Sequence, residues 1–371
     1  MRMDGNLKAF FELVRAGLWE KEARLSAFGD IDFNEVYRLA EEQSVGGLIA
    51  AGLEHVTDVK VPQEEALNFV AGALQLEQRN TAMNDYVARL VGELREAGVR
   101  AVLVKGQGIA QCYDRPLWRT CGDIDLLLDG DGYERAKALL LPRATEVEQE
   151  YTHFKHQGMT LDGWVVELHG TLHSRLSGRV DRGIDAVQAG MFADWRVRSW
   201  DDGGVQVSLP APDDDVVFVF THILHHFFFE GIGLRQICDW SRLLWTFRDE
   251  LDVALLERRL RGMGILSEWR AFAAFAVEWL GMPAEAMPLY SDEARWSRKA
   301  TRIGEFVLEV GNFGYNQRRD YRGMSYLARK LRSFWGRLRD MLRHVRLFPL
   351  DSVRFFGGVL RSGLHAAVRG E

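Results

Sequence analysis

The hydrophobic pattern of this 371-residue chain changes twice, and this change constrains the fold more than any other feature. Apolar residues recur at helical spacing before residue 98 and again after Pro212. Between these regions lie short apolar runs at residues 99–104 and 124–128, which are rich in β-branched residues or bounded by glycine and are typical of buried strands. We therefore expect an α+β fold in which a small mixed sheet is flanked by N-terminal and C-terminal helical regions.

The same pattern divides the chain into four predicted regions. We expect an N-terminal helical region at 1–97, an α/β core at 98–211, a C-terminal helical domain at 212–317 and a basic amphipathic tail at 318–371. The tail has an apolar stripe surrounded by arginines, and such a helix can lie on an anionic membrane or hold an acidic partner. It can equally pack its stripe on the acidic remainder of the chain.

Composition and charge exclude several classes of protein. The net charge is −6, and because the basic residues concentrate in the tail, the rest of the chain is acidic and does not resemble a duplex-DNA binder. Only three cysteines occur in the chain, which favours a reducing compartment, and none is in a CxxC pair, so a zinc ribbon is not expected. No secretion signal or membrane-length apolar stretch is present, so we expect a cytoplasmic protein.

Acidic residues at the predicted strands indicate a metal site. Asp123 and Asp125 are two positions apart at the start of a strand, so their side chains share one face of it. Glu167 and His169 share a face of another predicted strand. Neighbouring carboxylates repel each other unless a cation lies between them, and Mg²⁺ prefers oxygen ligands. A similar pentapeptide ends at Phe33, but there Asp32 precedes a predicted helix and is expected to cap it.

A phosphate-binding turn is predicted next to the acidic pair. The first strand ends at Lys105 and Gly106, and a helix follows. Gly106 and Gly108 allow the backbone to approach an anion, and Lys105 adds positive charge. The lysine precedes the glycines, so this is not the Walker pattern.

These residues resemble a known family. The order of Lys105-Gly106, Tyr113, Arg119, Asp123-Ile-Asp-Leu-Leu and Glu167-Leu-His is similar to that of the uncharacterised nucleotidyltransferase family of the DNA polymerase β-like superfamily. The resemblance extends to a histidine-bearing segment at 222–226 and to a Leu-Arg-x-x-x-Asp segment at 234–239. Members of this family occur in bacterial clusters for polysaccharide and natural-product synthesis.

The resemblance implies transfer of a nucleotidyl group from a nucleoside triphosphate to an acceptor hydroxyl or phosphate. Asp123, Asp125 and Glu167 would be the catalytic residues and would hold Mg²⁺ or Mn²⁺ in a two-metal mechanism. The nucleotide and its phosphates would be bound by Lys105, Gly106, Gln107, Arg119, His169 and Arg235. Gln107 stands where the superfamily usually has a serine that touches the triphosphate. Arg115 and Arg119 lie on the loop before the acidic pair and suit phosphate contacts.

Several interpretations stay open from the sequence alone. His222, His225 and His226 can line a pocket, bind a metal or contact phosphate. Arg235 and Asp239 are four residues apart, so they can pair on a helix surface, or Arg235 can line the cleft. The chain can also be a non-catalytic nucleotide-binding regulator, or a toxin-type nucleotidyltransferase that modifies RNA or protein.

Overall fold

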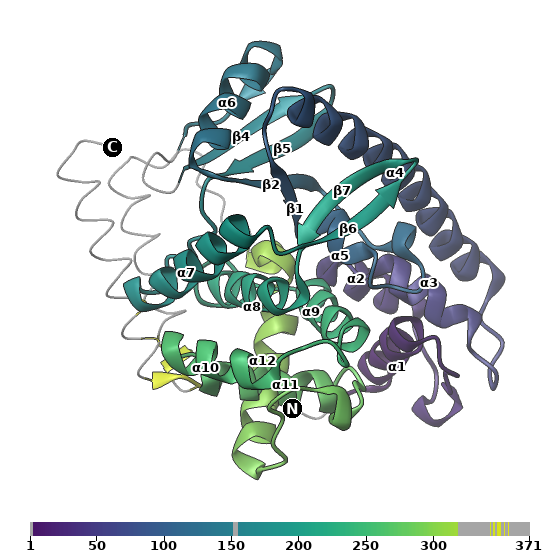
Figure 1. Ribbon diagram of the computed structural model, residues 1–371. Coiled ribbons are helices and arrows are strands. Elements are labelled where there is room, and N and C mark those ends of the chain that lie inside the picture. The colour runs from purple at the N-terminus through teal and green to yellow at the C-terminus, as the bar shows by residue number, and fades with distance from the viewer. Residues whose placement is uncertain are drawn as a thin grey trace, which may run out of the picture.

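The computed structural model describes residues 3–150 and 155–317, together with single residues between 342 and 355. Figure 1 shows a sheet near the top of the molecule, helices below it and a group of purple N-terminal helices at the right. This arrangement confirms the expected α+β class.

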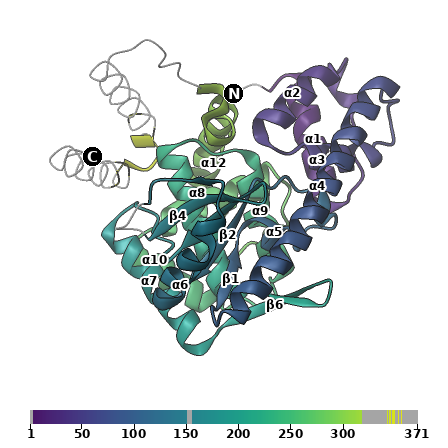
Figure 2. The same cartoon turned by 90° about the horizontal axis from the view of Figure 1, so that it is seen from above.

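The N-terminal region consists of helices α1 (Gly5–Trp19), α2 (Phe33–Gln43), α3 (Gly46–Glu54) and α4 (Gln63–Glu96). Apolar residues recur at helical spacing throughout residues 34–51, but this segment forms two helices because Ser44 adopts a left-handed conformation with φ 54° and ends α2. As expected, Asp32 caps α2 by accepting hydrogen bonds from the backbone. Helix α4 has 34 residues and runs from this helical group to the sheet (Figures 1 and 2).

The main sheet has five strands in the order β1-β2-β5-β4-β3. Its strands are β1 (Ala101–Val104), β2 (Asp123–Leu128), β3 (Glu146–Val147), β4 (His156–Leu161) and β5 (Trp164–His169). Strands β2 and β5 are parallel, whereas the other neighbouring pairs are antiparallel. The sheet is therefore mixed. Helix α5 (Gly106–Ala110) follows β1, and α6 (Gly130–Leu140) follows β2.

The two faces of this sheet belong to different cores. Leu103, Ile124 and Leu168 face α4 and α6 and form one apolar cluster with them. Val102, Val104 and Leu127 on the opposite face belong to the larger core built by the remaining helices. Because strand side chains alternate, Asp123 and Asp125 share the face of Leu127, so the strand pattern directs both carboxylates toward the C-terminal helices.

The rest of the chain covers that face. Helix α7 (Gly178–Asp194) and a two-stranded sheet of β6 (Val197–Asp202) and β7 (Val205–Pro210) precede α8 (Pro212–Phe229) and α9 (Leu234–Thr246). Helices α10 (Val253–Met263), α11 (Leu266–Glu278) and α12 (Ala294–Val310) complete the region. The alternating apolar residues at 205–209 form β7, whereas nothing in the sequence analysis predicted α7 and β6.

The basic tail expected at 318–371 lies outside the described residues except for the single positions named above. Of these, Phe348 has its ring 6.2 Å from that of Phe227 in α8. Within the described part of the chain, no helix combines the length and hydrophobicity that crossing a membrane requires.

Candidate functional site

Three carboxylates from two strands line one cavity. The parallel register places Asp125 of β2 opposite Glu167 of β5, and Asp123 lies two residues before Asp125 on the same face. The cavity has a volume of about 260 Å³. Its walls come from the sheet, from the turn after β1 and from α8 and α9, and they are lined by Lys105, Gly106, Ile109, Arg119, Asp123, Asp125, Glu167, Val219, His222, Ile223, His226, Glu230, Arg235, Gln236 and Asp239.

The turn after β1 brings Lys105 into this cavity. Lys105 has φ 58° and ψ −149°, a backbone conformation that costs a residue with a side chain about 1–3 kcal/mol. Gly106 follows with φ 43°. A Cβ at position 106 would lie 3.2 Å from the Cys121 Sγ, so glycine meets both a conformational and a steric requirement here.

Lys105 and His169 both contact Asp125. The Lys105 Nζ lies 2.8 Å from the Asp125 Oδ1. The His169 Nε2 lies 2.8 Å from the same oxygen. Burial would lower the pKa of Lys105, but the charges of Asp125, Glu167 and Asp123 raise it above its ordinary value. Asp125 is therefore a buried carboxylate held beside a lysine that remains protonated.

The other two carboxylates have shifted pKa values. Repulsion by Asp125, followed by burial, raises the pKa of Asp123 even though Lys105 lowers it. Burial would also raise the pKa of Glu167, but hydrogen bonds from His156 and His169 and the charge of Lys105 hold it well below its ordinary value. The raised pKa of Asp123 shows that Lys105 does not fully compensate this negative charge. Oxygen donors with excess negative charge fit a hard divalent cation.

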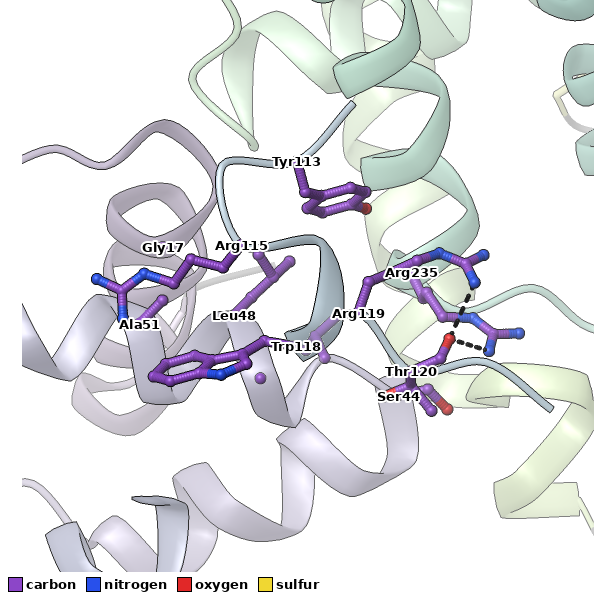
Figure 3. A pocket seen from close by; sticks show the side chains of 12 residues that line it. Gly17, Ser44, Leu48, Ala51, Tyr113, Arg115, Trp118, Arg119, Thr120 and Arg235 are labelled. Carbon is purple, nitrogen blue, oxygen red and sulfur yellow. Dashed lines mark hydrogen bonds between the residues drawn. The ribbon is translucent and has the colours of Figure 1, made fainter. Parts of the chain in front are cut away.

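Two arginines form the wall next to the loop at 115–120. The Arg119 Nε and Nη2 donate to the two carboxylate oxygens of Asp239 on α9, at 2.9 and 2.6 Å. The Arg235 Nη1 donates to the backbone carbonyl of Thr120 at 2.9 Å, and Arg119 also donates to this carbonyl (Figure 3). Asp239 pairs with Arg119, and both Arg235 and Asp239 line the cavity. Of the two open interpretations, the one in which Arg235 lines the cleft therefore fits the structure.

Two of the expected phosphate ligands point elsewhere. The Gln107 Nε2 donates to the Asn80 Oδ1 at 2.9 Å and contacts the Met83 Sδ, so this side chain packs on α4 and does not line the cavity. Arg115 pairs with Glu20 and Glu54 of the N-terminal helices. It lines a separate small pocket beside Trp118, shown in Figure 3. In both cases polar side chains on other elements engage the donor groups of these residues.

The wall opposite the carboxylates comes from α8. His222 and His226 are one turn apart, their Nε2 atoms are 3.0 Å apart, and both residues line the cavity. Burial and nearby Lys105 lower the pKa of His222 well below its ordinary value. His225 instead contacts the Ser174 carbonyl through Nδ1 at 2.6 Å. Of the open interpretations, pocket lining therefore fits His222 and His226.

One site residue was not predicted from the sequence. His156 on β4 lies opposite His169, and its Nε2 is 3.1 Å from the Glu167 Oε2. The signal that locates it is the Asp162–Gly163 turn, in which both residues have positive φ, as in a type I′ hairpin. A two-residue turn at 162–163 pairs Leu161 with Trp164. This first pair fixes the register of all pairs of β4 and β5 that lie further from the turn.

The structure gathers three carboxylates and a lysine on the walls of one cavity, and comparison with known families gives the class of protein. The model of the family described as "Uncharacterised nucleotidyltransferase" matches residues 29–281, so the chain belongs to this family. Membership supports nucleotidyl transfer as the general activity and a nucleoside triphosphate as a substrate. No curated protein and no solved structure matched the chain.

Proposed function

We propose that the protein transfers a nucleoside monophosphate group from a nucleoside triphosphate to an acceptor hydroxyl or phosphate in this cavity. The observation that carries the proposal is the convergence of Asp123, Asp125 and Glu167 beside Lys105 on the walls of a single cavity. Family membership supports the reaction type, and the cavity supports its location.

The transfer is an in-line displacement at phosphorus. An acceptor oxygen attacks the α-phosphorus of the triphosphate, the bond to the bridging β-phosphate oxygen breaks, and pyrophosphate leaves with the bonding electrons. If the acceptor is a hydroxyl, its proton must be removed. Because its pKa is held low, Glu167 is better suited to bind a cation than to retain this proton, which would pass on to water.

The carboxylates fit Mg²⁺ or Mn²⁺, and Asp123, Asp125 and Glu167 would hold these ions. Such ions, when bound, stabilise the charge that develops on the attacking and leaving oxygens. The chain's own residues supply the rest. Lys105 and Arg235 line the cavity and would bind the phosphates, while Arg119, whose guanidinium is engaged by Asp239, would position the loop that carries Thr120. When no ion occupies the neighbouring histidines, His169 would orient Asp125 through their hydrogen bond.

Donor identification tests this function first. The full chain is incubated separately with each α-labelled ribonucleoside and deoxyribonucleoside triphosphate and with Mg²⁺ or Mn²⁺. Pyrophosphate release, transfer of label to the protein, and the melting temperature are measured together. We expect one or a few triphosphates to raise the melting temperature and to release pyrophosphate, because a ligand that binds only the folded state stabilises it.

The outcomes separate the proposal from its alternatives. Stabilisation by a triphosphate without any turnover, across a panel of sugar phosphates, alcohols, RNA and proteins as acceptors, would contradict transfer and favour a regulatory nucleotide-binding protein. Growth arrest on expression, abolished by Asp123→Asn, would favour a toxin-type enzyme. Turnover that requires a small-molecule acceptor would support the proposal as stated.

A further inference from the structure

Three side chains of the types that bind metal ions lie close together at the edge of the carboxylate site. A nitrogen of His156, a nitrogen of His169 and an oxygen of Glu167 all lie within 4.8 Å of one another. The side chains of His156 and Glu167 are 21% and 25% exposed. They are therefore partly open to solvent, so an ion can reach these donor atoms.

The strand register forces this convergence. The tight turn at 162–163 pairs His156 of β4 with His169 of β5, and Glu167 lies two residues before His169 on the same face. The two imidazole rings stack with their centroids 4.8 Å apart and their planes 17° apart. Neither ring depends on a long flexible side chain for its position, because each comes directly from a paired strand.

The separations between donor atoms suit a bound ion. The Glu167 Oε2 lies 3.1 Å from the His156 Nε2 and 3.4 Å from the His169 Nε2. Metal–nitrogen and metal–oxygen bonds are about 2.0–2.2 Å long. If the angle between two ligands at the metal lies between a right angle and the tetrahedral value, the two ligand atoms are about 3.0–3.5 Å apart. The Glu167 oxygen thus already has ligand spacing from each of the two imidazole nitrogens.

The donor types select among ions. Imidazole nitrogen suits transition-metal ions such as Zn²⁺ and Fe²⁺ and can also bind Mn²⁺, although Mn²⁺ prefers oxygen, whereas Mg²⁺ is bound through oxygen and keeps much of its water. We propose that His156, Glu167 and His169 form a divalent transition-metal site beside the all-oxygen position between Asp123 and Asp125, and that Glu167 is shared by both. The ion at this site would differ in kind from the one held by the aspartates.

Binding of this ion does not depend on the proposed function, although any role in nucleotidyl transfer rests on it. The competing account is a polar network in which His169 orients Asp125 and His156 neutralises Glu167, with no ion bound. Both accounts predict that His156 contacts Glu167. Only the metal site predicts that an imidazole nitrogen coordinates an added cation.

The test uses the full chain, Mn²⁺ alone and no nucleotide. Electron spin echo spectroscopy of bound Mn²⁺ detects directly coordinated nitrogen, and calorimetry measures the affinity. The variant is His156→Gln, because His156 is the more exposed histidine. The matched control is His55→Gln, since His55 also pairs with a glutamate, Glu20, but in the N-terminal helices. Melting temperatures show that each variant is folded.

We expect nitrogen coupling in the wild type and in His55→Gln, and excess Mg²⁺ should not remove it. In His156→Gln the affinity should fall by about tenfold or more, since losing even a supporting residue of a metal site costs that much. Mn²⁺ binding without nitrogen coupling, or coupling that persists unchanged in both His156→Gln and His169→Gln, would overturn the site. Absence of pyrophosphate release in the donor screen would instead contradict nucleotidyl transfer and leave the metal result standing.

Discussion

Asp125 lies directly opposite Glu167 across the parallel pair of strands β2 and β5. This relationship joins two segments of the chain that are far apart in sequence and makes a single acidic surface from them. Lys105, at the end of the other strand that pairs with β2, lies 2.8 Å from Asp125 and supplies the nearby positive charge. The two carboxylates and the one ammonium group together set the charge that the site offers to a cation or a phosphate.

Replacing Gly106 should disturb the site through the backbone. Gly106→Ala places a Cβ 3.2 Å from the Cys121 Sγ at a residue with φ 43°. We expect a loss of about 1–3 kcal/mol in the free energy of unfolding and lower nucleotide affinity, because Lys105 would move with the turn. Gly92→Ala in α4 is the control, since nothing lies within 4 Å of its added Cβ. Equal stability for the two variants in urea denaturation would contradict this reading of the turn.

Removing Asp239 should leave a buried charge without its partner. The side chains of Arg119 and Asp239 are 6% and 5% exposed. We expect Asp239→Ala to lower the free energy of unfolding by about 3–5 kcal/mol, measured by urea denaturation. Glu257→Ala removes a far more exposed pair with Arg261, and its effect should stay below about 1 kcal/mol. A change of less than 1 kcal/mol for Asp239→Ala would mean that this pair does not hold the loop.

The half-buried His222 should make stability depend on pH. Its folded-state pKa is lowered well below the ordinary 6.5 by burial. The unfolded chain therefore binds a proton that the folded chain does not, and His222 costs stability as the pH falls below 6.5. His169, whose pKa is raised by Asp125 and Glu167 against burial, acts in the opposite direction over this range.

A variant isolates the His222 effect from that of His169. His222→Gln should become more stable relative to the wild type as the pH is lowered from about 7 to about 5.5, by up to about 1.4 kcal/mol per pH unit. The free energy of unfolding of both proteins is measured at each pH. A difference that stays constant across this range would show that His222 is not held neutral.

Lys105→Met should separate the binding of nucleotide from the binding of metal. It removes a charge that we place on the phosphates, so affinity for a non-hydrolysable triphosphate should fall by about 10–100-fold. The affinity for Mn²⁺ alone should rise, because the ammonium no longer competes for the Asp125 Oδ1. Calorimetry measures both affinities. Unchanged triphosphate binding would remove Lys105 from the phosphate site.

Much of the fold was predictable because the hydrophobic pattern is strong where elements bury one face. Strands β1, β2 and β5 and the helices after Pro212 lie close to their predicted positions. Strand β6 was missed because it has no fully buried residue, so its sequence shows no clear alternation. Helix α7 was missed although Val180, Ile184, Val187 and Met191 recur at helical spacing, so its sequence did carry a signal.

The site was predictable where strand alternation alone sets direction. Asp123, Asp125 and Glu167 share a face because they lie at alternate positions of paired strands. The side chains of Gln107 and Arg119 depend instead on partners from α4 and α9, which local sequence does not reveal. His156 was within reach, since the Asp162–Gly163 turn fixes its pairing with His169.

The central claim is that the paired carboxylates hold the ions on which nucleotidyl transfer depends. Its most direct test is pyrophosphate release at saturating triphosphate by the wild type, by Asp125→Asn and by Asp131→Asn, whose residue is exposed at the start of α6. We predict that Asp125→Asn loses at least about a thousandfold in rate, which is about 4 kcal/mol of transition-state stabilisation, while Asp131→Asn keeps the wild-type rate. Metal-dependent release at an undiminished rate from folded Asp125→Asn would contradict the claim.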